Sequence, residues 1–147
     1  MLARAAVAGM TVVGALALMA TPAQAAGNVK LLKAQYDSPG SDDRSNSSLN
    51  AETIVLYNSG STSVSLKGWT LRDETGYTYH FLPVKIGAGQ KLRVHTGRGD
   101  DTGHDVYWDR RAYVWNNTSD TATLRKASGD VKDTCSWDTG DDGSVPC

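Results

Sequence analysis

ETIVLYN at residues 52–58, followed by SGSTSVSLKGWTLRD at residues 59–73, is the stretch that decides the fold. In the first run the side chains alternate between two faces, so Ile54 and Leu56 share one face and Val55 and Tyr57 share the other. Apolar residues on both faces predict a strand in the core of a sheet. The Ser, Thr and Gly residues that follow predict a turn before the next strand.

The rest of the chain repeats this arrangement of short alternating runs separated by turns. Beyond the first 26 residues, no segment shows the apolar periodicity of a helix of about ten residues or more. The pattern predicts an all-β sandwich with a polar loop at residues 37–48 and a last hairpin turned by Ser128-Gly129. The expected strands lie at residues 29–36, 52–57, 64–66, 69–72, 77–81, 91–95, 106–108, 113–115, 121–125 and 131–137.

Taken with the motifs that follow it, the opening stretch resembles the lamin tail domain family. The shared features are an acidic strand ending in Asn58, the step Leu66-Lys-Gly-Trp69 and the closing Leu71-Arg-Asp73. Bacterial members of the family have a loop like residues 36–42. The resemblance covers about residues 28–137 and implies an immunoglobulin-like β-sandwich. Later matching pieces are residues 86–89, 94–99, 115–117, 120–124 and 133–135.

The resemblance implies a binding role and a set of core residues. Members of the family serve as adaptor or interaction modules, and the family has no shared active site from which a catalytic residue could be transferred. Gly68 is expected to turn the backbone so that Trp69 enters the sandwich as a buried anchor. An exposed Trp69 that binds a ligand is the alternative. Trp115 lies in another shared motif and is expected in the core.

The first 26 residues predict export. Arg4 supplies a basic start, an uncharged run extends from residue 5 to residue 20, and Ala23-Gln-Ala25 matches the small-x-small pattern of a cleavage site. We therefore expect a cleaved signal peptide at residues 1–25 and one secreted domain at residues 26–147, in a bacterial setting. A retained membrane anchor is the alternative, but the apolar run is shorter than the ~20 residues that span a bilayer.

The charge of the mature chain argues against some partners. Without Arg4 the 15 basic residues become 14 against 16 acidic ones, which gives a net charge of 14 − 16 = −2. This balance provides no strong signal for nucleic acid, which favours domains dense in Lys and Arg. We expect no membrane contact after the signal peptide is removed.

Cys135 and Cys147 are expected to form a disulfide, which is the default for a cysteine pair in an exported protein. The bridge closes a loop of about 13 residues, is worth about 3 kcal/mol and would pin the C-terminal tail. A redox-active or metal-binding pair is the alternative, although the CxxC spacing typical of such pairs is missing.

Two segments are candidates for binding. Tyr107, Trp108, Arg110 and Arg111 would form an aromatic and cationic platform for a ligand if the rings point outward. The alternative is that Trp108 caps the end of the sandwich.

The second candidate segment is the loop at residues 138–143. Asp138 and Asp142 occupy positions 1 and 5 of a calcium-loop pattern, but position 3 is Gly140 and no glutamate stands at position 12. No cofactor is otherwise expected.

These observations lead to two hypotheses about function. The first is a small secreted, non-catalytic interaction or adaptor module that binds an extracellular protein or surface polymer through its loops. The second is a carbohydrate- or cell-wall-binding module that uses exposed aromatic rings around Trp108. An enzyme is not expected, because the chain has no nucleophile elbow, zinc-helix or phosphate-loop motif.

Overall fold

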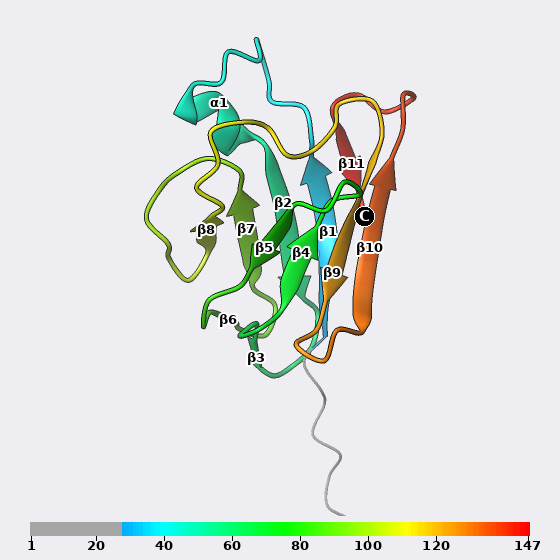
Figure 1. Cartoon of the computed structure of the whole chain (residues 1–147). Helices are drawn as coiled ribbons and strands as arrows, with labels where there is room; N and C mark the ends of the chain where they lie inside the picture. Colours follow the sequence, from blue (N-terminus) through cyan, green and yellow to red (C-terminus); the bar gives the residue numbers. More distant parts are fainter. Residues whose placement is uncertain (1–27) are drawn as a thin grey trace, which may run out of the picture.

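The computed structural model describes residues 28–147, in which two β-sheets face each other across an apolar core (Figure 1). The signal peptide expected at residues 1–25 lies outside the described residues. In chain order the elements are β1 (Val29–Gln35), α1 (Asn46–Ala51), β2 (Thr53–Asn58), β3 (Val64–Ser65), β4 (Thr70–Arg72), β5 (Thr78–His80), β6 (Lys85–Ile86), β7 (Lys91–His95), β8 (Asp105–Tyr107), β9 (Asp120–Arg125), β10 (Val131–Trp137) and β11 (Ser144–Pro146).

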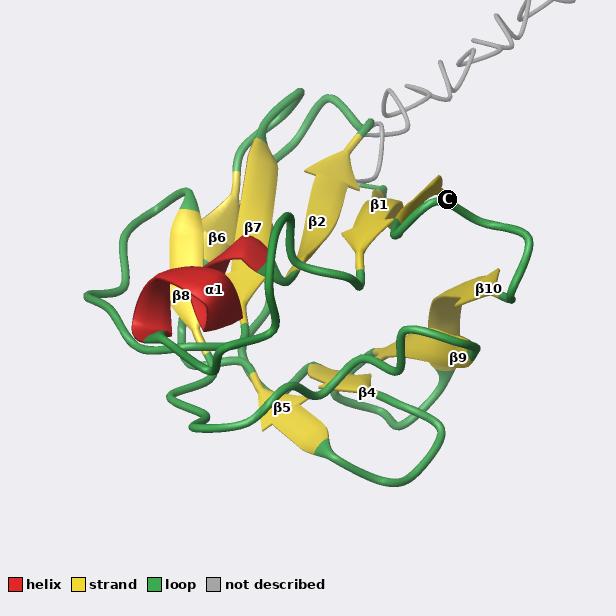
Figure 2. Ribbon diagram, turned by 90° about the horizontal axis from the view of Figure 1, so that it is seen from above, coloured by secondary structure: helices red, strands yellow, loops and turns green. Residues whose placement is uncertain are grey.

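The strands form the two layers of an immunoglobulin-like sandwich, as predicted. One sheet has the order β11-β1-β2-β7-β8 and the other has the order β10-β9-β4-β5, while β3 and β6 form a small separate ladder. Figure 2, which looks along the strands, shows the two layers on end. All neighbouring strands pair antiparallel except β7 and β8, which run parallel.

Alternating burial along the strands confirms the pattern on which the fold prediction depends. Ile54 and Leu56 of β2 have no exposed surface, and Val94 of the neighbouring β7 is also buried. The opposite sheet contributes Leu71 and Leu124 to the same core cluster. Burying each of these side chains contributes about 1.5–3 kcal/mol.

A continuous series of aromatic rings runs through the core. Neighbouring ring centroids lie 4.8–5.9 Å apart, and most of the pairs meet edge to face, the arrangement that aromatic quadrupoles favour. The series begins at the residue after β1 and ends at the residue after β5. Its members, in spatial order, are Tyr36, Trp137, Trp115, Trp108, Tyr79 and Phe81.

The last predicted hairpin is confirmed. β9 and β10 pair antiparallel, and the Lys126 N–H donates to the Asp130 carbonyl at 2.9 Å to close the turn. Gly129 has a φ of 91°, a conformation that favours glycine. The Ser-Gly turn signal therefore identified both the turn and the residue that makes it.

Trp69 differs from its expected role as a buried anchor. Gly68 does adopt the left-handed conformation, with a φ of 78°, and the Trp69 N–H donates to the Leu66 carbonyl at 2.9 Å across the turn. The side chain that this turn buries completely is Leu66, whereas Trp69 is half-buried and packs against the edge of the core. The leucine of the motif is the anchor because the turn aims it, and not the indole, into the sandwich.

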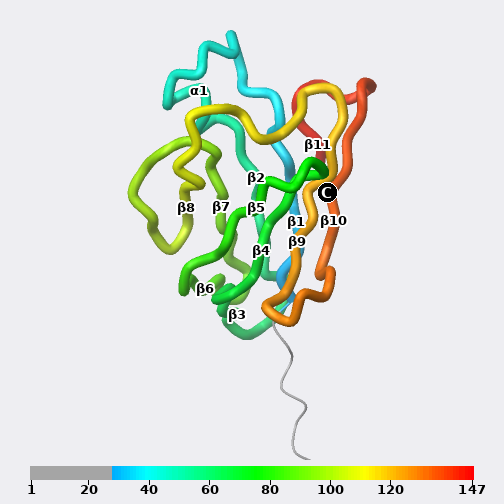
Figure 3. Tube along the Cα trace, in the orientation of Figure 1, coloured from blue at the N-terminus to red at the C-terminus, as the bar shows by residue number. Residues whose placement is uncertain are grey.

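Residues 113–115 do not form the expected strand. This segment crosses from β8 in one sheet to β9 in the other, over the end of the sandwich (yellow in Figure 3). Val114 and Trp115 are both buried although they are adjacent, so the alternation of a strand is absent. Their backbone N–H groups donate to the Glu52 carboxylate at 3.0 and 3.4 Å, and a side chain thus replaces a partner strand.

A short helix begins within the stretch expected to be a polar loop. Ser45 caps α1, and its hydroxyl accepts a hydrogen bond from the Ser48 N–H at 3.2 Å. The helix buries Leu49 against the end of the sandwich. At six residues it is too short to cross a bilayer, and no other helix occurs in residues 28–147.

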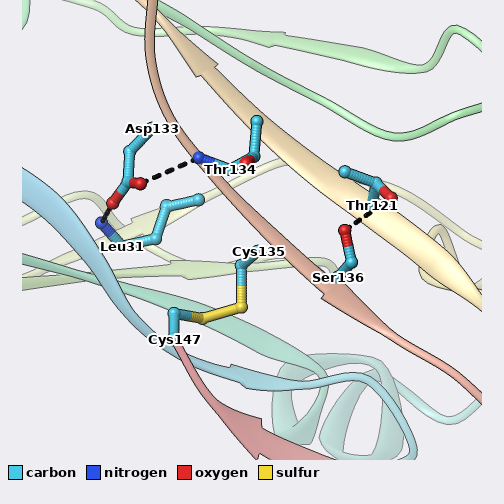
Figure 4. Close-up of a disulfide and its surroundings, with 7 residues drawn as sticks. All are labelled: Leu31, Thr121, Asp133, Thr134, Cys135, Ser136 and Cys147. Atoms are coloured by element: carbon cyan, nitrogen blue, oxygen red, sulfur yellow. Dashed lines mark hydrogen bonds between the residues drawn. A yellow bond between two sulfur atoms is a disulfide. The ribbon is translucent and has the colours of Figure 1, made fainter.

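The disulfide between Cys135 and Cys147 is confirmed, with a Cα–Cα distance of 5.3 Å. The bridge does more than hold a loose tail, because the residues before Cys147 form β11, which already pairs with β1. Cys135 lies on β10 in the opposite sheet, so the bridge joins the two sheets (Figure 4). Beside it, the Asp133 carboxylate of β10 accepts a hydrogen bond from the Leu31 N–H of β1 at 2.8 Å.

Candidate functional site

The aromatic pair expected to form a platform is turned toward the protein. Trp108 is half-buried and packs against the core, with its ring centroid 5.7 Å from that of Tyr79 and 5.9 Å from that of Trp115. Tyr107 stacks on the ring of His95 at 4.8 Å. These contacts agree with the alternative in which Trp108 caps the end of the sandwich, because both rings pack against other rings of the protein.

The arginines of the same segment belong to a different arrangement. Arg110 and Arg111 line a cavity of about 350 Å³ together with Arg44 and Arg98. The cavity lies at the end of the sandwich that α1 covers, where three segments distant in sequence meet (Figure 1). Asn46 and Leu49 of α1 complete its lining. We call this set of four side chains the arginine cluster.

Two asparagines of α1 hold the backbone at Arg98. The Asn46 side chain accepts from the Arg98 N–H at 2.8 Å and donates to the Arg98 carbonyl at 2.9 Å, so both backbone groups are bound by one amide. Asn50 donates to the same carbonyl at 2.9 Å. A Cβ on Gly97 would lie 2.8 Å from the Asn46 side-chain oxygen and closer still to that of Asn50. A side chain at position 97 would therefore force these two asparagine side chains to move.

The segment that carries Arg110 is attached to the same strand end. The Asp109 N–H donates to the Gly97 carbonyl, and the Arg110 N–H donates to the Thr96 carbonyl, both at 2.9 Å. Asp109 has a φ of 59° and Arg44 has a φ of 58°. No other non-glycine residue within 28–147 has a positive φ, so both of these uncommon conformations occur beside the arginine cluster.

None of the four guanidinium groups forms an ion pair with a carboxylate within residues 28–147. The one arginine–carboxylate ion pair in residues 28–147 joins Arg93 to Asp105, and none of these four guanidinium groups takes part in it. Arg110 lies over the ring of Tyr77 at 4.3 Å, a cation–π contact that leaves its charge uncompensated. Like charges that line one cavity repel one another. An anion in the cavity would offset this repulsion.

A buried carboxyl group lies behind the site and holds its segments together. Glu52 has no exposed surface, and its Oε1 atom accepts from the Thr96 hydroxyl at 2.5 Å as well as from the two N–H groups of residues 114–115. The Oε2 atom is buried with no hydrogen-bond partner. Desolvation by burial raises the pKa of Glu52 to about 7, despite the hydrogen bonds that act in the opposite direction.

The acidic loop considered for calcium is organised by hydrogen bonds instead. An oxygen of Asp138 accepts from the Gly140 N–H at 3.0 Å, and Asp141 accepts from the Asp138 N–H at 3.2 Å. Asp142 is not brought to Asp138 in a ligand cluster. Within residues 28–147 no group of three or more His, Cys, Asp or Glu side chains is close enough to hold a metal ion. The geometry provides no support for calcium at Asp138 and Asp142.

Sequence reasoning selected Arg110 and Arg111 but missed Arg44 and Arg98. The sequence places Arg44 in a polar loop and Arg98 in a glycine-rich turn, with no periodic pattern connecting them. Only the packing of α1 beside the end of β7 brings them to one cavity.

Comparison with known proteins identifies the family but no individual relative. No curated protein matches the chain. The match to the family described as Lamin Tail Domain, immunoglobulin-like domains that are not known to be catalytic, covers residues 22–139. Most of the chain lies within this match, and the chain therefore belongs to the lamin tail domain family.

Proposed function

We propose that this protein is a non-catalytic interaction module that acts outside the cell and binds its partner at the α1 end of the sandwich. The observation that carries the proposal is the arginine cluster, in which four cationic side chains line one cavity without carboxylate partners in residues 28–147. Surface arginines that serve only solubility have no need to converge. A cavity of this kind is a binding surface for an anionic group.

Three properties of the molecule support this role. The hydrogen bonds of Asn46 and Asn50 fix the backbone at Arg98 before any partner arrives, which lowers the entropy cost of ordering this part of the site on binding. The disulfide suits an oxidising environment outside the cell. The signal-like N-terminus suits the same location.

The alternative of a carbohydrate-binding module has weaker support. It relied on aromatic rings exposed around Trp108, and this indole is turned into the end of the sandwich. We therefore assign recognition to the arginines. Arg110 and Arg111, two of the residues that the sequence selected, stay part of the proposed surface.

The proposal is tested by retention of the purified protein on insoluble cell-wall fragments and on immobilised secreted proteins. We compare the wild type with an Arg98→Gln, Arg110→Gln double variant. The matched control is Lys67→Gln, Lys126→Gln, because these exposed lysines lie in two adjacent turns at the opposite end (Figure 1). Retention should be lost in the arginine variant, kept in the lysine control and weakened by salt. Equal retention of both variants, or none of the wild type, would refute the proposal.

Export is tested separately. The protein should accumulate in the culture medium, and its N-terminal sequence should begin at Ala26. A cell-associated protein that keeps residues 1–25 would contradict this part of the proposal.

A further inference from the structure

Resting on the proposed function, we infer that the arginine cluster binds a compact tetrahedral oxyanion, a phosphate or sulfate group that is free in solution or borne as a terminal ester on a sugar. The inference concerns the chemistry of the bound group. It follows from the number of donors, from the volume and lining of the cavity and from the acidic residues around it.

The number of unused donors exceeds what a carboxylate can accept. A guanidinium has five N–H donors in a planar fork. The side chains of Arg44, Arg98 and Arg111 make no hydrogen bond or ion pair to any residue in 28–147. A carboxylate offers two oxygens, whereas a terminal phosphate or sulfate ester offers three, and a phosphate ester carries a charge close to −2 at neutral pH.

The cavity has room for more than one small group. Its volume of about 350 Å³ leaves space beside a single oxyanion for the sugar that carries it. Leu49, which is almost completely buried, provides an apolar part of the wall. The other lining side chains are an asparagine and the four arginines, so the wall is mainly polar and suits a charged group.

The surrounding charges favour a compact anion over a long polyanion. Exposed aspartates stand next to the arginines in the sequence, with Asp43 before Arg44 and Asp109 before Arg110, and residues 100–101 follow the turn of Arg98. These carboxylates would repel a phosphodiester backbone laid across the site. A single terminal group needs only the guanidinium groups that line the cavity, whereas an extended polyanion would also have to pass these neighbouring carboxylates.

The backbone beneath two of the arginines has a defined and uncommon conformation. Arg44 itself has a positive φ, and Arg110 follows the positive-φ residue Asp109. For residues other than glycine this conformation has an energetic cost, and it persists where the surrounding structure determines it. The backbone positions from which these two arginines project are therefore set before binding.

The experiment is isothermal titration of the purified protein in chloride buffer at constant ionic strength. The probes are inorganic phosphate, glucose 6-phosphate, glucose, acetate and a short random-sequence DNA duplex. Inorganic phosphate and glucose 6-phosphate should both bind, while glucose and acetate should not. Tighter binding of glucose 6-phosphate would identify the esterified sugar as the source, and equal binding would identify the free anion.

Variants and a spectroscopic readout place the binding site. Arg98→Gln and Arg111→Gln should each weaken phosphate binding at least tenfold, as expected for loss of a hydrogen bond to a charged group. Lys67→Gln should leave it unchanged. In NMR spectra, phosphate should shift the Leu49 methyl signals and the Arg98 amide signal. Folding of each variant is verified by an unchanged spectrum elsewhere.

Three results would overturn the inference: no binding of either phosphate probe, equal binding of acetate, or binding of the DNA duplex alone. Loss of wall retention in the arginine variant, combined with no phosphate binding, would refute this inference and leave the proposed function standing. Phosphate binding at the cavity without retention of any exported material would refute the proposed function and leave this inference standing.

Discussion

Replacing Glu52 with glutamine should change how the stability of the protein depends on pH. Burial raises the pKa of this carboxyl group from its ordinary 4.5 to about 7 in the folded protein. Between these two values the folded state holds a proton that the unfolded state has lost. The free energy of unfolding therefore falls as the pH rises from about 4.5 to about 7.

The size of the effect follows from the two pKa values. The difference between about 7 and the ordinary 4.5, at about 1.4 kcal/mol for each pKa unit, corresponds to about 3 kcal/mol of stability. This contribution is fully present below about pH 4.5 and lost above about pH 7. Glutamine keeps an oxygen for Thr96 and for the N–H groups of residues 114–115, and it carries no charge at any pH.

The assay is urea unfolding at pH 5, 6, 7 and 8, followed by circular dichroism. Glu52→Gln should have a stability close to that of the wild type at pH 5 and should exceed it by about 2–3 kcal/mol at pH 8. The matched control is Glu74→Gln, which alters the other glutamate of the chain, an exposed one. It should follow the wild type at every pH. A Glu52→Gln variant whose stability runs parallel to that of the wild type would refute the reasoning.

Three further predictions concern the frame of the sandwich and of the site. Cys147→Ser should lower the unfolding midpoint by about 10 °C in calorimetry, the equivalent of about 3 kcal/mol, and a fully unfolded variant would mean that joining the sheets is indispensable. Trp115→Ala should lower the free energy of unfolding in urea by about 3–5 kcal/mol and Trp69→Ala by clearly less, because only the Trp115 indole is fully buried. A larger loss for Trp69→Ala would contradict this difference in burial. Gly97→Ala should weaken phosphate binding as strongly as Arg98→Gln, since a Cβ there displaces the asparagine side chains of α1 that bind the Arg98 backbone. Unchanged phosphate binding in calorimetry would show that these asparagine hydrogen bonds are not needed for the site.

The sandwich could be predicted because its information is local. Alternation placed Ile54 and Leu56 in the core, and the Ser-Gly pair identified the turn between β9 and β10. The cysteine pair indicated the bridge between β10 and the residue after β11. The first two features depend on residues that are neighbours in the sequence, and the third depends on the tendency of a cysteine pair to form a disulfide in an oxidising environment.

The features that were missed depend on contacts between distant segments. Residues 113–115 have the composition of a strand, but the Glu52 carboxylate takes their N–H groups and leaves them without a ladder. Trp69 follows the expected turn, yet the geometry of that turn buries Leu66 instead. Arg44 reaches the other arginines only through α1, whose six residues are too few to show a helical period.

The aromatic series in the core gives the protein a built-in optical reporter. Three of the four tryptophans belong to it, with ring centroids 5.9 Å apart along the series, so excitation of one indole passes readily to the next. Their fluorescence therefore describes the closed sandwich as a unit. Trp69 is outside the series, in the turn between β3 and β4, where it emits as a separate local probe. Separation of the two sheets and local unfolding around Trp69 should thus differ in the wavelength and lifetime of tryptophan fluorescence in the unlabelled protein.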